Sequence, residues 1–352
     1  MTTPPKRITI KRPDDWHLHL RDGAVLSTVL PFTAAHFGRA IVMPNLTPPV
    51  TTIAEAGAYH DRIVEALPPD VNFKPLMTCY LTDYTNPDAV ELGFMEGIFT
   101  AVKLYPAKAT TNSEFGVTAW DKIRDVLARM EKIGMPLLVH GEESDPKIDI
   151  FDREAVFIDK VLNGWMTSDY PALKIVVEHI TTKEGVDFVL EAGGNIGATV
   201  TPHHLVINRN DILAGGIRPH LYCLPIAKRD KHRRALREAV TSGNDSFFLG
   251  SDSAPHLKSA KETDCGCAGI FNAANAIEVY ANVFDEMNSL DYFEGFSSLN
   301  GPKFYGLETN DSTITLEQKV HPAIGNVNLP CGEEVIRPFL SEEELNWLVV
   351  DC

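Results

Sequence analysis

Long apolar runs are missing from this sequence. Residues 1–15 are mostly polar and contain no apolar stretch of signal-peptide length, and no later run approaches the roughly 18 apolar residues that a membrane-spanning helix requires. These absences exclude a membrane-embedded protein. They predict a cytoplasmic location with no membrane partner.

Paired cysteines are also missing. The six cysteines lack the spacing of a disulfide framework, so reduced thiols are expected at Cys79, Cys223, Cys265, Cys267, Cys331 and Cys352. Cys265 and Cys267 form one closely spaced pair, whereas a cysteine-type zinc site needs a second pair. A metal role for these two residues is therefore disfavoured, and their role stays open.

Positive charge is scarce. The chain has 32 Lys and Arg residues against 48 Asp and Glu residues, a formal net charge of −16. Such a surface repels a phosphate backbone, so nucleic acid is not expected as a partner. An acidic protein can still bind an anionic small molecule if metal ions and a few arginines make its pocket locally positive.

Short apolar, β-branched runs recur along the chain, each followed by a stretch of helical length. Runs of this kind suit parallel strands that are buried on both faces. Eight such alternations predict an α/β fold, a (β/α)8 barrel of the TIM type, in preference to an open doubly wound sheet. The predicted strands are Ile8–Ile10 continuing to Trp16–Leu20, Ala40–Met43, Val71–Leu81, Phe99–Tyr105, Pro136–His140, Leu173–His179, Ile196–Thr201 and Phe247–Ser251.

Helices are predicted between the strands and in a C-terminal tail. Those between strands are Ile53–Ala66, Ala119–Ile133, Asp152–Trp165, Thr182–Ala192 and Lys228–Ser242. In the tail, residues 271–352, helical patterning covers Asn272–Glu286, and the capping-box spacing of Ser341 and Glu344 predicts one last helix. No linker stands out. Residues 1–352 are expected to form a single barrel domain with a C-terminal helical extension packed on it.

Candidate metal ligands gather at the predicted strand ends, where a barrel carries its chemistry. His17 and His19 are two residues apart, so they project from the same face of an extended strand, as does Arg21. Lys103 ends an apolar strand, where an ammonium group is costly. Either its amine reaches solvent, or a lowered pKa lets it take up carbon dioxide and become a metal-bridging carbamate.

His140 and His179 close two successive predicted strands, and Asp252 closes the eighth. With the first-strand pair and Lys103, they suit two borderline cations of the zinc type. Two such ions would lower the pKa of a bridging water from about 15.7 to about 7, which makes hydroxide the nucleophile. Asp252 could take the proton during attack on an amide and pass it to the departing nitrogen.

Several longer segments give the sequence a resemblance to a known family. It resembles the amidohydrolase superfamily and, most closely, the short, monofunctional class II dihydroorotases, over most of its length. The segments are Trp16–Asp22, Met43–Asn45, Val102–Ala107, Val139–Glu142, Glu178–His179, Gly250–His256 and Cys265–Gly269. Several matches in the right order are more specific than any single pair of ligands.

The resemblance implies a cofactor and a reaction. The cofactor is two zinc ions per subunit, one held by His17, His19 and Asp252 and the other by His140 and His179, with Lys103 bridging them as N6-carboxylysine. The reaction is the reversible, zinc-dependent cyclisation of N-carbamoyl-L-aspartate to L-dihydroorotate, a step of pyrimidine (UMP) synthesis. In the hydrolytic direction, hydroxide attacks the ring amide carbonyl.

The resemblance also implies a set of substrate contacts. They are Arg21, Asn45 and His256 for the substrate carboxylate, backbone groups of Leu224 and Ala268 for the pyrimidine edge, and Thr110 and Thr111 in loop 106–113, which would close over the acyclic substrate. An ordinary surface loop is the alternative for 106–113.

Two other functions are considered. A hydantoinase-like cyclic amide hydrolase is the main alternative, but His17 lies too early in the chain to leave room for the β-sandwich that hydantoinases carry, so no separate β-sandwich domain is expected. A non-catalytic scaffold with the amidohydrolase fold would lack ligands, and every ligand position is filled. Dimers are common in the family, so a homodimer is expected.

Overall fold

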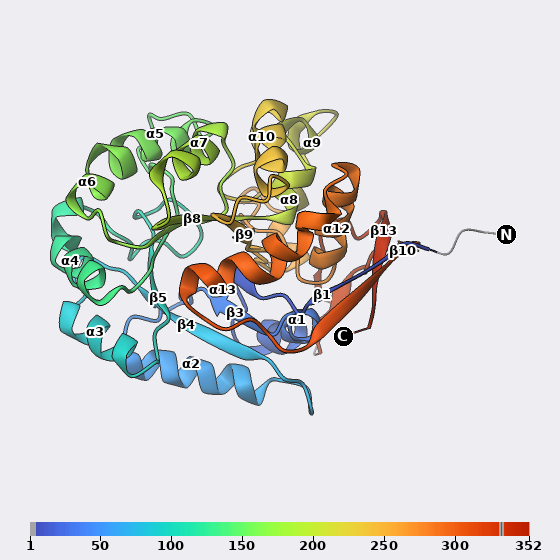
Figure 1. The fold of residues 1–352 in the computed structure, drawn as a ribbon, viewed down its shortest axis with the longest axis horizontal. Helices are drawn as coiled ribbons and strands as arrows, with labels where there is room; N and C mark the ends of the chain where they lie inside the picture. Colours follow the sequence, from blue (N-terminus) through green and yellow to red (C-terminus); the bar gives the residue numbers. More distant parts are fainter. Residues whose placement is uncertain (1–4, 331, 333, 352) are drawn as a thin grey trace.

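An eight-stranded parallel barrel lies at the centre of the computed structural model, which describes residues 5–330, 332 and 334–351 (Figure 1). The strands follow one another in chain order, and each neighbouring pair is parallel. They are β2 (Asp15–Leu18), β3 (Arg39–Val42), β4 (Lys74–Tyr80), β5 (Ala101–Leu104), β6 (Leu137–Val139), β7 (Ile175–Val177), β8 (Ile196–Val200) and β9 (Phe247–Leu249). The predicted barrel is confirmed.

Hydrogen bonds between the first and last barrel strands close the sheet. Just beyond β9, the amide of Asp252 donates to the carbonyl of His17 at 2.8 Å, and the amide of His19 donates to the carbonyl of Ser253 at 2.9 Å. Leu18 and Ser253 form a parallel bridge at the same place. The open doubly wound sheet is therefore excluded.

Helices surround the barrel, as Figure 1 shows. The helix α2 begins at a capping box formed by Thr52 and Glu55. The helices are α1 (Gly23–His36), α2 (Ile53–Glu65), α3 (Pro87–Met95), α4 (Arg124–Ile133) after a 3₁₀ turn over Trp120–Ile123, α5 (Arg153–Phe157) continued by a π-helix over Ile158–Met166, α6 (Thr167–Asp169), α7 (Lys183–Ala192), α8 (Pro202–Val206), α9 (Arg209–Leu213) and α10 (Asp230–Val240). The helices predicted between strands are confirmed.

Apolar side chains fill the barrel below its mouth. The interior cluster comprises Trp16, Ile41, Met43, Leu76, Ala101, Leu138, Val176 and Phe248. Gly197 leaves space for the ring of Phe248, because a Cβ at this position would lie 2.8 Å from it. In the same cluster, Trp16 stacks on Tyr305 of α13 (Asn300–Tyr305) with ring centroids 4.5 Å apart. Polar chemistry is thereby confined to the C-terminal ends of the strands.

Both ends of the chain contribute to a small antiparallel sheet. The strand β1 (Arg7–Lys11) pairs with β10 (Thr313–Pro322), which pairs with β13 (Glu344–Asp351); β11 (Val327–Asn328) and β12 (Val335–Ile336) form a separate two-stranded sheet. The expectation that Ile8–Ile10 continues into the first barrel strand is therefore wrong. Pro13 separates the two strands, since it has no amide to donate to a sheet.

The last helix predicted from Ser341 and Glu344 is also wrong. In β13, Leu345 and Trp347 are buried and alternate with exposed residues. This period of two selects a strand over the helix that a capping-box spacing favours. Earlier parts of the tail are helical, in α12 (Ala276–Glu286) and α13, and Tyr280 of α12 donates a hydrogen bond to the carbonyl of Val200 in β8 at 2.7 Å.

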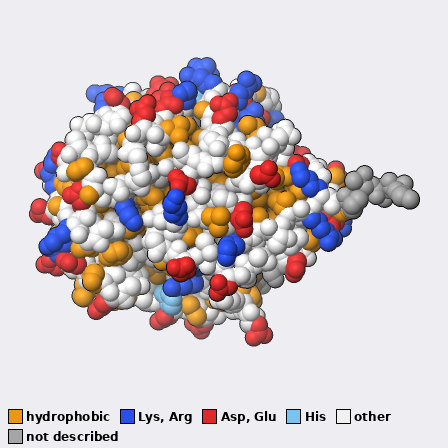
Figure 2. Space-filling model, viewed as in Figure 1, with side chains coloured by type: hydrophobic (Ala, Val, Ile, Leu, Met, Phe, Trp, Pro, Cys, Tyr) orange, Lys and Arg blue, Asp and Glu red, His pale blue; other side chains and the backbone are white. Residues whose placement is uncertain are grey.

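Three further expectations concern membranes, thiols and surface charge. Within the described ranges, no helix is long and apolar enough to cross a membrane. Cys79, Cys223, Cys265 and Cys267 are free thiols as predicted, whereas Cys331 and Cys352 lie outside the described residues. On the face seen in Figure 2, lysine and arginine side chains are scattered among acidic ones rather than gathered in one patch.

Candidate metal centre

The six predicted metal ligands meet at the C-terminal ends of the barrel strands. They are His17 in β2, His19 directly after it, Lys103 in β5, and His140, His179 and Asp252 beyond β6, β7 and β9. We call these six residues the ligand cluster. All are buried, with at most 9% of any residue exposed.

His17, His19 and Asp252 form the tightest part of the ligand cluster. Nε2 of His19 lies 3.2 Å from Oδ1 of Asp252, and Nε2 of His17 lies 3.6 Å from the same oxygen. The ring of His179 is centred 4.9 Å from that of His17 and 4.9 Å from that of His140. One ligand atom from each of the first three residues lies within 4.8 Å of the others, a spacing that fits a shared cation.

Oxygen atoms behind the imidazoles orient them. Nδ1 of His17 donates to Oε2 of Glu178 at 2.7 Å, and Nδ1 of His19 donates to Oδ1 of Asn45 at 2.7 Å. These bonds place a proton on Nδ1 and leave Nε2, which faces Asp252, free to bind a metal. The sequence reasoning assigned no role to Glu178. Its position just before a predicted ligand at a strand end was the available signal.

Burial sets the charge of the ligands. It is the largest cause of the lowered pKa of His17 and of His179, both well below the ordinary value. Burial alone would raise the pKa of Asp252, but the close imidazoles of His19 and then His17 bring it below its ordinary value. The residues therefore adopt the forms that bind metal, neutral imidazole and ionised carboxylate.

Lys103 is fully buried, and its amine lies over the ring of Tyr105, 5.0 Å from the ring centroid. Its side chain is fully enclosed, and Nζ has no hydrogen-bond partner among the residues that the structure describes. Burial lowers the pKa of Lys103 to about 8, because an ammonium group in an apolar interior lacks solvation. The alternative in which the amine reaches solvent is therefore wrong. A buried amine that is easily deprotonated suits conversion to a carbamate.

Three residues of the site have backbones in the left-handed region that residues with side chains rarely adopt. The φ angle is 60° at Arg21, 43° at His179 and 44° at Asp252. Each such residue costs on the order of 1–3 kcal/mol, and such strain is concentrated at functional sites. Hydrogen bonds hold the strained backbone: the amide of His179, for example, donates to Oγ1 of Thr199 at 2.7 Å.

A small cavity joins the ligand cluster to the predicted substrate contacts. The predicted contacts that line it are Arg21, Asn45, Thr110, Thr111, Leu224 and Ala268. His256 lies beside Arg21, with its Nε2 3.2 Å from Nη2 of the arginine, and Nε2 donates to the carbonyl of Ala268 at 3.0 Å. Because the N–H of His256 is used by Ala268, the guanidinium of Arg21 supplies the donors that suit a carboxylate.

Loop 106–113 packs over this cavity. Oγ1 of Thr111 donates to the carbonyl of Ala268 at 3.2 Å, and Nδ2 of Asn45 donates to the carbonyl of Thr111 at 3.1 Å. In return, Nδ2 of Asn112 donates to the carbonyl of Asn45 at 2.9 Å. These contacts connect the loop to both sides of the cavity. They favour a covering loop over an ordinary surface loop.

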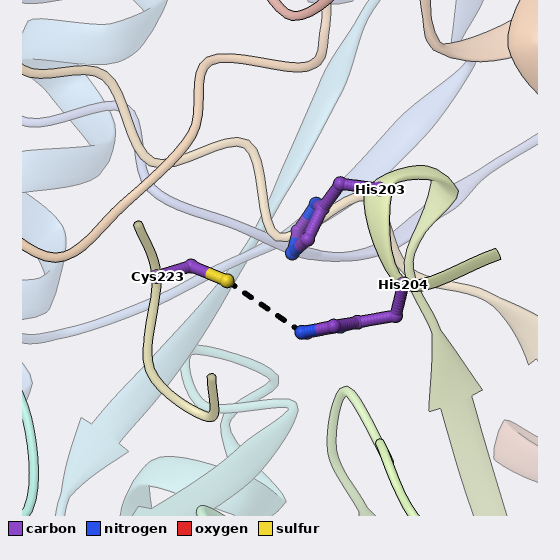
Figure 3. A group of neighbouring side chains, drawn as sticks. All are labelled: His203, His204 and Cys223. Atoms are coloured by element: carbon purple, nitrogen blue, oxygen red, sulfur yellow. Dashed lines mark hydrogen bonds between the residues drawn. The ribbon is translucent and has the colours of Figure 1, made fainter. Parts of the chain in front are cut away.

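A second group of ligand-type side chains, which the sequence reasoning missed, is drawn in Figure 3. We call His203, His204 and Cys223 the His203 cluster. Sγ of Cys223 lies 3.5 Å from Nε2 of His204. Asn272 connects the two groups, because its Nδ2 donates to Nδ1 of His203 and to the carbonyl of Ser251, beside Asp252. Adjacent histidines at the end of a predicted strand were the only sequence signal.

Comparisons with known proteins agree with this geometry. The profile of the amidohydrolase family matches residues 10–316. The chain is 57% identical to the dihydroorotase of Photorhabdus laumondii subsp. laumondii over 347 residues, which cover 99% of this chain and 98% of that protein. Its fold is similar to the crystal structure of the dihydroorotase from Campylobacter jejuni, with 35% identity, a TM-score of 0.89 and 99% of both chains covered.

A second solved structure gives the same result. The fold is similar to that of the dihydroorotase of Saccharomyces cerevisiae in complex with 5-fluoroorotic acid, with 30% identity, a TM-score of 0.88 and coverage of 97% of this chain and 98% of that one. The relatives match this chain over nearly their whole length, which fits the short, monofunctional form. The chain therefore belongs to the amidohydrolase family and, within it, to the dihydroorotases.

Proposed function

We propose that this protein is a dihydroorotase that interconverts N-carbamoyl-L-aspartate and L-dihydroorotate in pyrimidine synthesis. The observation that carries the proposal is one cavity lined by Arg21, Leu224, Ala268 and every member of the ligand cluster except Lys103. The substrate has a scissile ring amide, a carboxylate and a pyrimidine edge. Each of these parts finds a matching group within one pocket.

Enzymes of this family depend on metal, and the residues of the ligand cluster fit a metal centre. The free Nε2 atoms beside Asp252 and the unpartnered Lys103 nitrogen support the fit. One zinc ion would be held by His17, His19 and Asp252 and a second by His140 and His179, with carboxylated Lys103 between them. When bound, the ions would polarise the amide carbonyl and lower the pKa of a water molecule toward about 7.

Asp252 moves the proton. Its lowered pKa keeps the carboxylate ionised, so in hydrolysis it can accept a proton from the attacking water. It then delivers that proton to the ring nitrogen as the C–N bond breaks, and the order reverses in ring closure. The amide of Asp252, bonded to the carbonyl of His17, keeps the carboxylate beside the metal ligands during both steps.

Donors on one side of the cavity would bind the substrate carboxylate. The guanidinium of Arg21 offers a planar fork, and the ring of His256 lies beside it. Asn45 has one amide proton available for the same group, because its oxygen accepts from His19 and its other amide proton donates to Thr111. Thr110 and Thr111 would bind the acyclic substrate as loop 106–113 covers it.

A substrate comparison tests the proposal. Hydrolysis of dihydroorotate and of hydantoin is measured on protein of known metal content, and dihydroorotate is expected to be preferred by orders of magnitude. A preference of similar size for hydantoin would instead establish the hydantoinase-like alternative. Turnover of neither compound by metal-loaded protein would favour a non-catalytic scaffold.

We further propose that the enzyme is a cytoplasmic homodimer that acts on a small molecule and binds neither nucleic acid nor membrane. The dimer and the location follow from the family resemblance, and the scattered surface charge in Figure 2 supports the absence of a nucleic-acid partner. Analytical ultracentrifugation at micromolar concentration tests the dimer, for which twice the 38.9 kDa chain mass is expected.

A further inference from the structure

Lys261 is a buried lysine outside the ligand cluster. It ends the short helix α11 (Lys258–Lys261), and 3% of the residue is exposed. Its Nζ donates to three backbone carbonyl oxygens, those of Tyr222, Cys267 and Gly269, at 2.8, 2.7 and 2.8 Å. An ammonium group has three N–H donors and no acceptor, so these carbonyls use its whole hydrogen-bonding capacity.

The three carbonyls belong to the two segments that form the backbone wall of the cavity. Tyr222 lies two residues before Leu224, and the other two carbonyls flank Ala268; both Leu224 and Ala268 line the cavity. The two segments also touch directly, since the amide of Gly269 donates to the carbonyl of Tyr222 at 3.1 Å. Lys261 therefore connects the two segments by hydrogen bonds from outside the cavity.

The carbonyl of Ala268 has different partners from those of its neighbours. It accepts hydrogen bonds from Oγ1 of Thr111 in loop 106–113 and from Nε2 of His256. Because Lys261 holds the carbonyls before and after it, the direction of the Ala268 peptide is fixed. The flanking backbone is unusual, with φ of 21° at Cys267 and 150° at Gly269. The hydrogen bonds from Lys261 stabilise this conformation.

We propose that Lys261 is a positioning residue, which fixes the Ala268 peptide as the docking point for loop 106–113 and as part of the substrate-binding wall. The inference rests on the proposed function for the identity of the ligand. The hydrogen bonds by which Lys261 stabilises residues 266–270 do not depend on that function. Loss of the lysine should therefore weaken ligand binding while the metal ligands stay in place.

The first test compares two lysines of the same helix. Lys261→Met keeps the length of the side chain and removes the three donors, whereas Lys258→Met changes an exposed lysine and serves as the matched control. Calorimetry on zinc-loaded protein should show binding of 5-fluoroorotate weakened about tenfold or more in Lys261→Met. KM should rise by a similar factor while kcat falls less, with metal content unchanged. Unaltered affinity in a folded Lys261→Met protein would overturn the proposal.

A double-mutant cycle separates positioning from general loss of structure. Thr111→Val removes the hydroxyl that donates to Ala268. If Lys261 acts through that carbonyl, the combined variant loses less affinity than the product of the two single losses, because the shared contact is already gone. Losses that multiply fully would show that the two residues act independently and would refute the positioning role.

Hydrogen exchange tests the hold without any ligand. In Lys261→Met, the amides of residues 266–270 should exchange about tenfold or more faster, with the barrel strands unchanged. If this variant does not fold, Lys261→Gln, which retains two donors, is measured in its place. Exchange at the wild-type rate in the folded variant would overturn the inference. If Lys261→Met exchanges faster but the wild-type protein does not turn over dihydroorotate, the proposed function is wrong and the structural role of Lys261 remains supported.

Discussion

The ligand cluster and the His203 cluster lie side by side at the mouth of the barrel, and they differ in what their ring nitrogens already bind. In the ligand cluster, Glu178 and Asn45 take the rear nitrogens of His17 and His19, so each Nε2 is free beside Asp252. Rear partners of this kind prepare an imidazole for metal, because they fix the tautomer and the ring orientation.

In the His203 cluster, both ring nitrogens of His204 are occupied. Nδ1 of His204 lies 2.8 Å from Oγ1 of Thr201, and its Nε2 donates to the carbonyl of Pro225 at 2.9 Å. A nitrogen that carries a proton to a carbonyl has no lone pair for a metal. Burial also raises the pKa of Cys223 to about 12, which keeps the sulfur as a thiol. Proximity of ligand-type side chains is therefore not enough to make a metal site. The hydrogen bonds of the ligand atoms decide whether these atoms can bind metal.

The largest effect is expected from Lys103→Ala. The variant should lose bound metal and with it all measurable dihydroorotate turnover, because no other residue supplies the bridge between the two halves of the ligand cluster. Metal content by mass spectrometry and turnover are measured together, with the exposed Lys132→Ala as the control. Two zinc ions retained at full occupancy would refute the bridging role.

The second-largest effect is expected from Asp252→Asn. An amide cannot accept the proton, so turnover in both directions should fall by about 10²–10⁴-fold, the usual contribution of a general base. The matched control is Asp245→Asn, at an exposed aspartate just before β9. Near-normal turnover by metal-loaded Asp252→Asn would rule out the proton-transfer role.

Arg21→Met tests the carboxylate contact. Removal of a charge-assisted hydrogen bond should weaken dihydroorotate binding by roughly 10–100-fold. Neutral cyclic amides without the carboxylate should lose little affinity, and the exposed Arg234→Met should behave as the wild type. Equal losses for both kinds of ligand would contradict the proposed salt bridge.

Glu178→Gln tests the rear partner of His17. The imidazole can still be bonded, but the amide is a weaker acceptor, so zinc affinity should fall by about tenfold or more. The affinity is measured by competition with a chelator, with Glu191→Gln on the exposed side of α7 as the control. Unchanged zinc affinity would show that the rear partner does not prepare the ligand.

The smallest effect is expected in the His203 cluster. Cys223→Ala should leave the zinc content unchanged, because the thiol and the imidazole of His204 are not available as ligands. The measurement is metal content after dialysis against zinc. Loss of an ion in this variant would show that the second cluster binds metal and would erase the difference between the clusters.

The barrel and the meeting of the six candidate ligands at its mouth could be predicted from the sequence because both depend on local patterns. Buried parallel strands are short, continuous apolar runs, and the chain places His140 and Asp252 directly after two of them. Barrel geometry then brings the six residues of the ligand cluster together. The resemblance supplied the substrate contacts, and Arg21 and Ala268 do line the cavity.

Features that depend on distant contacts could not be predicted. Cys223 joins His204 across an intervening loop and helix, and Glu178 reaches His17 across the barrel. At the chain ends, the pairing of β1 with β10 cannot be read from the local sequence, and Pro13 was the one local signal that β1 is separate from the barrel strand that follows. Lys261 likewise looks like one more surface lysine until its three carbonyl partners are seen.

The most direct test of the account is a titration of zinc into metal-free protein, with dihydroorotate hydrolysis as the readout. Activity should be absent without metal, rise with added zinc and stop rising at two ions per chain, and Cys223→Ala should follow the same curve. Full activity in the metal-free protein, or a requirement for a third ion that Cys223→Ala abolishes, would contradict the assignment of the catalytic centre to the ligand cluster.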